Sequence, residues 1–205
     1  ISSIKYEVVQ WQGFALTKQY AISLSSNDYI LWLDSDEVLS DKLIIEINSL
    51  KETKEFADAY SIPRKAIFIG KWIKHSGWYP GRVIRLFNKN NASFNDNKVH
   101  EGLKFISNTI PVELKNDIIH YTDRNLVHYL NKLNTYTSLA AEELIVKGKT
   151  ISLLDIILRP FWIFIKMYLI KAGFLDGMHG FLLASYSSFY VFVKYTKLWE
   201  LKQGK

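Results

Sequence analysis

The 205-residue sequence contains no cysteine, only 4 prolines, and no long uninterrupted hydrophobic run. Without cysteine the chain has neither disulfide bonds nor thiolate metal sites, which fits a reducing compartment. The most apolar stretches lie beyond Ile151, but charged residues and Pro160 interrupt the first of them. The second, residues 180–193, offers about 14 uncharged residues against the roughly 18–20 that a membrane span needs. Neither is therefore predicted to cross a membrane.

The remaining composition is that of a globular protein with a net charge of +6, 48% hydrophobic residues and 22% charged residues. A positive balance favours anionic partners such as nucleotides, phosphorylated glycans or acidic lipid surfaces. The basic residues are scattered rather than gathered on one recognition helix. We therefore expect no nucleic acid among the partners.

The character of the sequence changes near residues 122–126, where strand-like segments give way to helical ones. We expect a main domain over residues 1–122 and a helical, amphipathic extension over residues 123–205. The extension has two interpretations: a basic, aromatic helix that lies on an anionic membrane surface, or an apolar helical subdomain that packs on the main domain. The sequence leaves both open.

The first half of the chain predicts an α/β fold. A helix is expected from Gly13 to about Leu24, and the apolar run 29–33, which lacks polar alternation, predicts a strand covered on both faces. Ser40 can cap a following helix whose apolar residues recur at spacings of four and three. Helix, strand and helix in this order indicate a mostly parallel sheet flanked by helices. In such sheets ligands gather at the carboxyl ends of the strands.

Three carboxylates, Asp34, Asp36 and Glu37, follow that predicted strand directly. Two of them, spaced two residues apart on a turn, can share a divalent cation and a nucleotide, because hard cations prefer oxygen ligands and complete their shell with phosphates and water. A solvated acidic loop is the plainer interpretation. The stretch 34–39 also fits the first motif of haloacid-dehalogenase-type phosphohydrolases, but the later acidic motif of the kind Gly-Asp-x-x-x-Asp is absent from the sequence.

A wider pattern from about Trp11 to Leu201 resembles family 2 glycosyltransferases, specifically lipopolysaccharide core glycosyltransferases of the WaaE/KdtX type. Six ordered motifs carry the resemblance: "WQGFALTKQYAI", "YILWLDSDEVLS", "GWYPGRVIRLF", "VHEGL", "IIHY" and "GFLDGMHGF". It implies a GT-A (Rossmann-like) fold, a nucleotide-sugar donor such as a UDP-sugar, Mg²⁺ or Mn²⁺, and inverting sugar transfer. Because family members carry a further strand and helix ahead of the segment matched here, we also expect the chain to be truncated at its amino terminus.

The same resemblance assigns roles to the strand-end carboxylates. It implies that Asp34 contacts the ribose or sugar of the donor and that Asp36 binds the metal on the diphosphate. Glu37 is expected to position these two aspartates without contacting the ligand itself. A metal that neutralises the charge developing on a nucleoside diphosphate lowers the barrier to its departure.

Inversion also needs a base that takes the proton of the acceptor hydroxyl. The pair His100-Glu101 resembles the family's "HE" pair, so Glu101 is our candidate base, with Asp96 in reserve. A plain ion pair of Glu101 with Arg82 or Arg85 is the alternative. His120, at the end of an apolar strand, is a candidate metal ligand or donor to the diphosphate, and His100 is the other candidate ligand. A histidine at a strand end is more commonly an ordinary hydrogen-bonded residue.

Four further residues are candidates for binding the nucleotide-sugar. Arg82 and Arg85 lie three apart on a predicted strand and so on opposite faces, and by its place in the motif we choose Arg85. Trp78 and Tyr79 can form a stacking platform for a sugar, or simply a packed turn. Lys18, in a segment that resembles a family motif, is a candidate for holding the diphosphate, although a solvated lysine is the commoner case.

The sequence therefore predicts a membrane-associated, metal-dependent enzyme that transfers a hexose to a lipid-linked surface glycan such as lipopolysaccharide core. The implied partners are the donor, a glycolipid acceptor and an anionic membrane. The implied location is peripheral, on the cytoplasmic face of the bacterial inner membrane. The alternative is a non-catalytic, truncated glycosyltransferase-like module that binds at the membrane.

Overall fold

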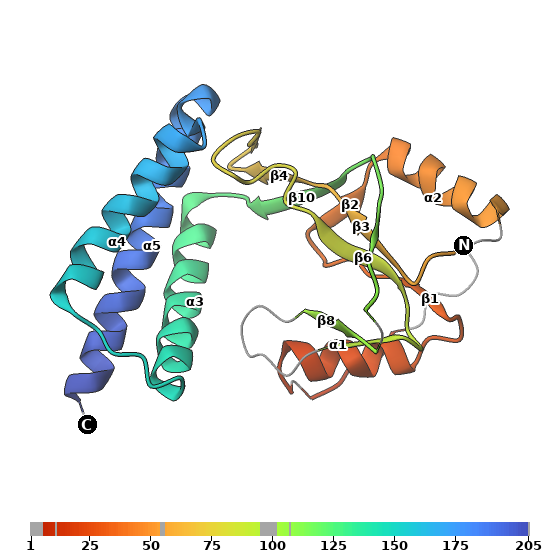
Figure 1. The fold of residues 1–205 in the computed structure, drawn as a ribbon, viewed down its shortest axis with the longest axis horizontal. Coiled ribbons are helices and arrows are strands. Elements are labelled where there is room, and N and C mark those ends of the chain that lie inside the picture. The colour runs from red at the N-terminus through yellow and green to blue at the C-terminus, as the bar shows by residue number, and fades with distance from the viewer. Residues whose placement is uncertain (1–5, 11, 54–55, 95–101, 107, 205) are drawn as a thin grey trace.

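The structure is a computed structural model and describes residues 6–10, 12–53, 56–94, 102–106 and 108–204. It has two parts (Figure 1): small sheets with two helices at the amino-terminal end, and a group of long helices at the carboxyl-terminal end. The predicted change of character lies where β10 (Ile118–Asp123) ends and α3 (Leu126–Val146) begins.

Two helices belong to the first part, α1 (Phe14–Ser23) and α2 (Asp41–Thr53). Both were predicted. Ser40 caps α2, since its hydroxyl oxygen accepts a hydrogen bond of 3.3 Å from the backbone N–H of Leu43. This satisfies one of the amide groups that a helix start leaves without a partner.

Within the described residues, the strands form two four-stranded sheets and one two-stranded sheet. The first sheet has the order β1 (Tyr29–Leu31), β6 (Val83–Asn88), β3 (Ala59–Ile62), β9 (Val112–Glu113). The second has the order β2 (Glu37–Leu39), β10, β4 (Arg64–Phe68), β5 (Lys71–Trp72), and β7 (Ala92–Phe94) pairs with β8 (Leu103–Phe105).

The prediction of a mostly parallel sheet is wrong, because most of the described strand pairs are antiparallel. Among the described pairs, only β3 with β9 and β4 with β10 are parallel, and the other five are antiparallel. Parallel neighbours need a long crossover, whereas short turns favour antiparallel pairs, as at residues 69–70 between β4 and β5. The mixed sheets with parallel pairs and flanking helices still fit a Rossmann-like α/β fold.

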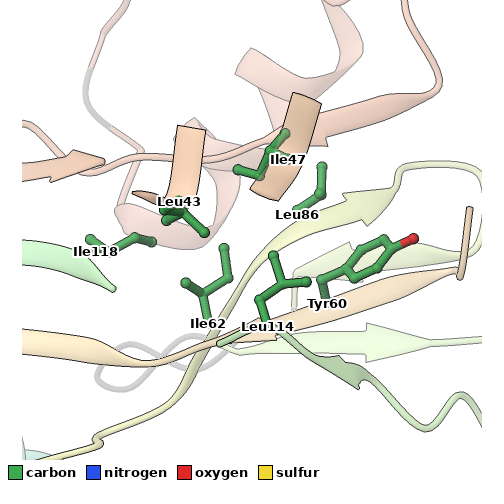
Figure 2. Close-up of a cluster of buried hydrophobic side chains, with 7 residues drawn as sticks. All are labelled: Leu43, Ile47, Tyr60, Ile62, Leu86, Leu114 and Ile118. Atoms are coloured by element: carbon green, nitrogen blue, oxygen red, sulfur yellow. The ribbon is translucent and has the colours of Figure 1, made fainter. Parts of the chain in front are cut away.

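A core of apolar side chains fixes α2 on the strands (Figure 2). Leu43 and Ile47 of α2 point at side chains from β3, β6 and β10 and from the loop ahead of β10; these are Tyr60, Ile62, Leu86, Leu114 and Ile118. Burying an aliphatic side chain of this size stabilises a fold by about 1.5–3 kcal/mol. Because α2 follows β2 directly, this packing also holds the turn at residues 34–37.

The second part consists of α3, α4 (Leu153–Ile165), a π-helical turn (Lys166–Ile170), a 3-10 turn (Gly173–Asp176) and α5 (Met178–Gln203). A capping box between Ser152 and Asp155 starts α4. Figure 1 shows α4 and α5 side by side, with α3 on the side that faces the sheets.

A buried aspartate joins the helices to the sheets. Asp176 is 3% exposed, and its carboxylate accepts a 2.8 Å hydrogen bond from the backbone N–H of His75 and lies 3.1 Å from that residue's Nδ1. Gly173 and Gly180 lie so close that a Cβ on Gly180 would come within 1.8 Å of the Gly173 carbonyl oxygen. The glycine-rich stretch 173–180 is thus a packed corner between the helices and the sheets.

Among the described residues, no helix has the length and apolar character to cross a membrane. The outer face of α4 is nevertheless apolar and open to solvent, and its exposed residues are Leu153, Leu154, Ile157, Leu158, Phe161 and Trp162.

Candidate active site

The three predicted carboxylates lie on one tight turn between β1 and β2. The Glu37 N–H donates to the Asp34 carbonyl oxygen at 3.0 Å, and the Asp34 N–H donates to Oε2 of Glu37 at 3.2 Å. The Glu37 side chain is fully buried, while those of Asp34 and Asp36 are one-third exposed. Glu37 therefore stabilises the turn from inside the protein, whereas the side chains of the two aspartates remain partly exposed.

Asp34 is held by positive and polar groups from α1, from β6 and from Trp32, which directly follows β1. Its oxygens lie 2.5 Å from Nη2 of Arg85 and 3.3 Å from Nζ of Lys18, and one accepts a 3.1 Å hydrogen bond from the Trp32 indole N–H. Burial alone would raise the pKa of Asp34, but Arg85, Trp32 and Lys18 outweigh it and hold the pKa below its ordinary value. Asp34 is thus a firmly ionised carboxylate.

Arg85 of β6 and Arg82, which directly precedes this strand, diverge as their spacing predicted. Nη2 of Arg85 contacts both Asp34 and Oε1 of Glu37, the latter at 2.7 Å. Arg82 turns to the other face, where it donates to the carbonyl oxygens of Ser61 and Leu114. Only Arg85 belongs to the carboxylate turn.

Asp36 faces β10 instead. Its Oδ2 lies 3.2 Å from Nε2 of His120, because β10 pairs antiparallel with β2 and places His120 opposite Glu37. Burial lowers the pKa of His120, although the charge of Asp36 acts in the opposite direction. The other ring nitrogen, Nδ1, is buried and has no hydrogen-bond partner among the described residues.

The described part of the chain contains no group of three or more histidine, cysteine or acidic side chains arranged to hold a metal ion. Mg²⁺ often binds through only one or two carboxylates and completes its shell with substrate phosphates and water. Asp36, one-third exposed beside His120, fits such a site, whereas both oxygens of Asp34 already face donors. These residues therefore fit a metal ion that binds together with a phosphate group of the substrate.

A cleft of about 490 Å³ opens on the Asp36 side of the turn, between the second sheet and the helices α3 and α5. Its walls include Arg64 and His120 from the sheet, and Trp78 from the turn that precedes β6. Tyr79 is not among the lining residues: its hydroxyl donates to Asp117 at 3.1 Å and its ring packs edge-on against Trp72. The two aromatic residues therefore do not act together as one platform in this structure.

Comparison with known proteins places the chain among bacterial glycosyltransferases. It is 30% identical over 206 residues to an uncharacterized glycosyltransferase of Rickettsia typhi, covering 96% of this chain and 70% of that protein. A Rickettsia prowazekii glycosyltransferase, also uncharacterized, is 29% identical over 95% of the chain and 70% of its own length. This chain belongs to their glycosyltransferase family.

A more distant relative carries a more specific name. The lipopolysaccharide core biosynthesis glycosyltransferase LpsC of Rhizobium meliloti is 23% identical, over 96% of the chain and 73% of that protein. No protein-family model matches the chain. The recognition made from the sequence motifs is confirmed at the level of a glycosyltransferase with relatives in lipopolysaccharide core biosynthesis.

Three predicted residues of this glycosyltransferase, Asp96, His100 and Glu101, lie outside the described residues. The candidate base and the second candidate histidine ligand therefore stay predictions.

Sequence reasoning missed other residues that line the cleft. Arg64, Asp123, Lys132 and Tyr136 were not singled out. Asp123 carried a usable signal, because it is an acidic residue at the end of a strand, like Asp34. The residues of α3 carried none, since only the fold brings that helix to the cleft beside β10.

Proposed function

We propose that this glycosyltransferase is a metal-dependent, inverting enzyme of family 2 and the GT-A type. It transfers a hexose from a nucleotide-sugar such as a UDP-sugar to a lipid-linked surface glycan of the lipopolysaccharide core type. The observation that carries the proposal is the turn that presents Asp34 and Asp36 beside a cleft, in a chain whose relatives are glycosyltransferases.

On the donor side, Asp36 would hold Mg²⁺ or Mn²⁺ with His120 as its neighbour, and Asp34 would accept a hydroxyl of the donor's ribose or sugar. The firmly ionised state of Asp34 supports the second role, since an ionised carboxylate is a strong acceptor. When bound, the metal ion would offset the negative charge that builds on the departing diphosphate. Lys18 and Arg85, both within reach of Asp34, bring positive charge to the same place.

The transfer forms a bond from an acceptor oxygen to the anomeric carbon of the sugar as the bond to the diphosphate oxygen breaks. The acceptor hydroxyl loses its proton to a base on the face opposite the diphosphate. The family resemblance assigns this role to Glu101, with Asp96 in reserve.

For the location, we propose peripheral binding to the cytoplasmic face of the bacterial inner membrane. The exposed apolar face of α4 supports this, together with the exposed Lys166 and Lys171 that follow it. An amphipathic surface of this kind gains affinity from buried apolar area and from attraction to anionic lipids.

The test is release of nucleoside diphosphate from a panel of sugar nucleotides by the complete gene product, with a glycolipid acceptor extract and with either Mn²⁺ or a chelator. We expect release from one donor, dependent on metal and reduced at least 100-fold by Asp36→Asn. Asp41→Asn, which changes an exposed aspartate in the first turn of α2, is the matched control and should keep the activity.

The opposite result is release from none of the donors, with no metal-dependent thermal protection by nucleoside diphosphates. That result would reject the catalytic proposal and favour a non-catalytic binding module. Release of phosphate from small phosphate esters instead would point to a phosphohydrolase.

A further inference from the structure

The cleft beside Asp36 contains features that the donor site does not use. Its volume of about 490 Å³ lies within the roughly 300–1,000 Å³ of small-molecule sites. One wall comes from β4 and β10, and the other comes from α3 and α5, which lie far along the chain. Two residues, Arg64 and His120, belong both to this cleft and to the surroundings of the carboxylate turn. A ligand in the cleft would therefore lie next to the reacting end of the donor.

Asp123 lines the cleft, and one of its carboxylate oxygens accepts no hydrogen bond from the described residues. The residue is 5% exposed, and the Thr122 hydroxyl donates to its Oδ2 at 2.6 Å. Its Oδ1 is buried and accepts no hydrogen bond from the described residues, although Nδ1 of His128 is 3.4 Å away. Buried carboxylate oxygens are normally paired, because leaving one without a donor is costly. A ligand hydroxyl is a donor that suits this position.

Two cationic side chains, Arg64 and Lys132, also line the cleft, and their contacts with Glu37 and with Thr122 are long. Nη1 of Arg64 is 3.9 Å from Oε1 of Glu37, at the limit of an ion pair, and burial lowers the pKa of Arg64 more than Glu37 raises it. Across the cleft, Nζ of Lys132 makes a long hydrogen bond of 3.4 Å to the Thr122 carbonyl oxygen. Two cations on opposite walls suit an anionic ligand.

Aromatic rings complete the lining. Trp78, Tyr136 and Tyr190 lie on the walls, so flat apolar surfaces stand close to the charged groups. Tyr190 belongs to α5, whose neighbours Phe189 and Phe192 are exposed on the helical part of the molecule. Apolar faces, a carboxylate oxygen without a hydrogen bond and two cations form the combination that an anionic sugar needs.

We infer that this cleft binds the acceptor glycan through a sugar that carries a phosphate or a carboxylate. Lys132 and Arg64 bind the anionic group, Asp123 accepts a hydroxyl hydrogen bond, and the aromatic rings pack against the sugar. This inference rests on the proposed function, and it adds the chemical class of the acceptor and the residues that recognise it.

The test is steady-state kinetics of the complete gene product with its donor and a lipid-free core oligosaccharide as acceptor. We expect Lys132→Gln to raise the acceptor KM at least 10-fold and to change the donor KM less than twofold. Lys149→Gln, at an exposed lysine between α3 and α4, removes the same charge elsewhere and should change neither constant.

The source of the negative charge is identified with two modified acceptors, one freed of phosphate and one with its carboxylates reduced. The wild type should lose affinity for one of them, whereas Lys132→Gln should no longer distinguish it from the intact acceptor. Asp123→Asn is the second variant and should also raise the acceptor KM.

Three outcomes would overturn the inference while leaving the glycosyltransferase in place. They are an unchanged acceptor KM in both variants, an equal loss of affinity for the modified acceptors in wild type and Lys132→Gln, and a rise in donor KM alone. The last would assign the cleft to the donor. Failure of the proposed function is distinct, since it would appear as no metal-dependent release by the wild type with any donor.

Discussion

Nη2 of Arg85 lies 2.7 Å from Oε1 of Glu37, whose side chain is completely buried beneath the carboxylate turn. The same guanidinium nitrogen contacts Asp34, so one arginine fixes both ends of the turn. A buried cation that loses its partner is expensive, because the remaining charge stays out of water. The shape of the turn therefore depends on Glu37, even though Glu37 does not face the ligand side.

We predict that Glu37→Ala destabilises the protein by about 3 kcal/mol, the lower end of the range for breaking a buried ion pair, since Asp34 still pairs with Arg85. Urea denaturation measures the change. Glu113→Ala is the control: it removes an ion-pair partner of Arg82, the residue directly before β6, but Glu113 is 67% exposed, so about 1 kcal/mol or less is expected. Equal losses in the two variants would mean that Glu37 is not the support of the turn.

A second carboxylate connects α2 to the loop ahead of β10 and makes stability depend on pH. Glu46 accepts hydrogen bonds from the backbone N–H groups of Lys115 and Asn116 at 2.9 and 3.0 Å. Burial raises the pKa of Glu46, but these hydrogen bonds outweigh it, so the pKa lies below its ordinary value of 4.5. As the pH falls, the unfolded chain takes up the proton first, and folding loses this contribution.

The prediction is that Glu46→Gln lowers Tm by about 2–4 °C at pH 7, as expected for a loss near 1 kcal/mol. The difference from wild type should be constant above the ordinary pKa and should shrink as the pH falls below it, through the lowered pKa. Calorimetric scans between pH 7 and pH 3 measure this. A difference that stays constant over the whole range would contradict the assigned hydrogen bonds.

Much of the first part of the fold could be predicted because its signals are local. The helices α1 and α2 follow a glycine break and a serine cap with apolar residues at helical spacing. The directions of the strands could not be predicted, since the apolar run 29–33 indicates burial and not which neighbour it pairs with. Its partner, β6, comes more than 50 residues later and runs antiparallel to it.

The candidate site also combines features that the sequence predicted with features that it could not predict. Spacing predicted that Arg82 and Arg85 face opposite sides, because alternate residues of a strand do so, and the place of Arg85 in the motif selected it. His120 was expected at a strand end, but it is the third residue of β10, and it lies close to Asp36 because β10 pairs antiparallel with β2. The cleft was not predictable, because Lys132 reaches it from a helix whose position depends on contacts between distant segments, such as Asp176 with His75.

The packed corner at residues 173–180 leads to a prediction about stability. A Cβ on Gly180 would come within 1.8 Å of the Gly173 carbonyl oxygen, so backbone must move to admit it. Overpacking of this kind costs about 1–3 kcal/mol, and at about 2–4 °C per kcal/mol we expect Gly180→Ala to lower Tm by roughly 2–12 °C. Gly204→Ala, where the nearest atom would lie at 3.6 Å, should change Tm little. If both variants melt like wild type, the close approach of the two segments is wrong.

The exposed face of α4 gives the last prediction. Phe161 and Trp162 are 63% and 55% exposed, and neighbouring apolar residues make a surface that would bind a membrane through apolar contact and nearby lysines. We expect the protein to sediment with anionic phospholipid vesicles at low salt and to be released as salt rises, because screening weakens attraction to the lipid headgroups.

The double variant Phe161→Gln/Trp162→Gln should weaken vesicle binding at least fivefold without changing Tm by more than about 2 °C, because exposed positions contribute little to folding. Its control is Ile44→Gln/Ile45→Gln, which removes two exposed apolar side chains from α2 in the other part of the molecule. Equal vesicle binding by wild type and the α4 variant would remove α4 from the membrane contact. A wild type that stays in the supernatant at low salt would exclude binding to such a surface altogether. Selective loss in the α4 variant would instead orient the enzyme with its helices on the membrane and the cleft beside them, within reach of a lipid-linked acceptor.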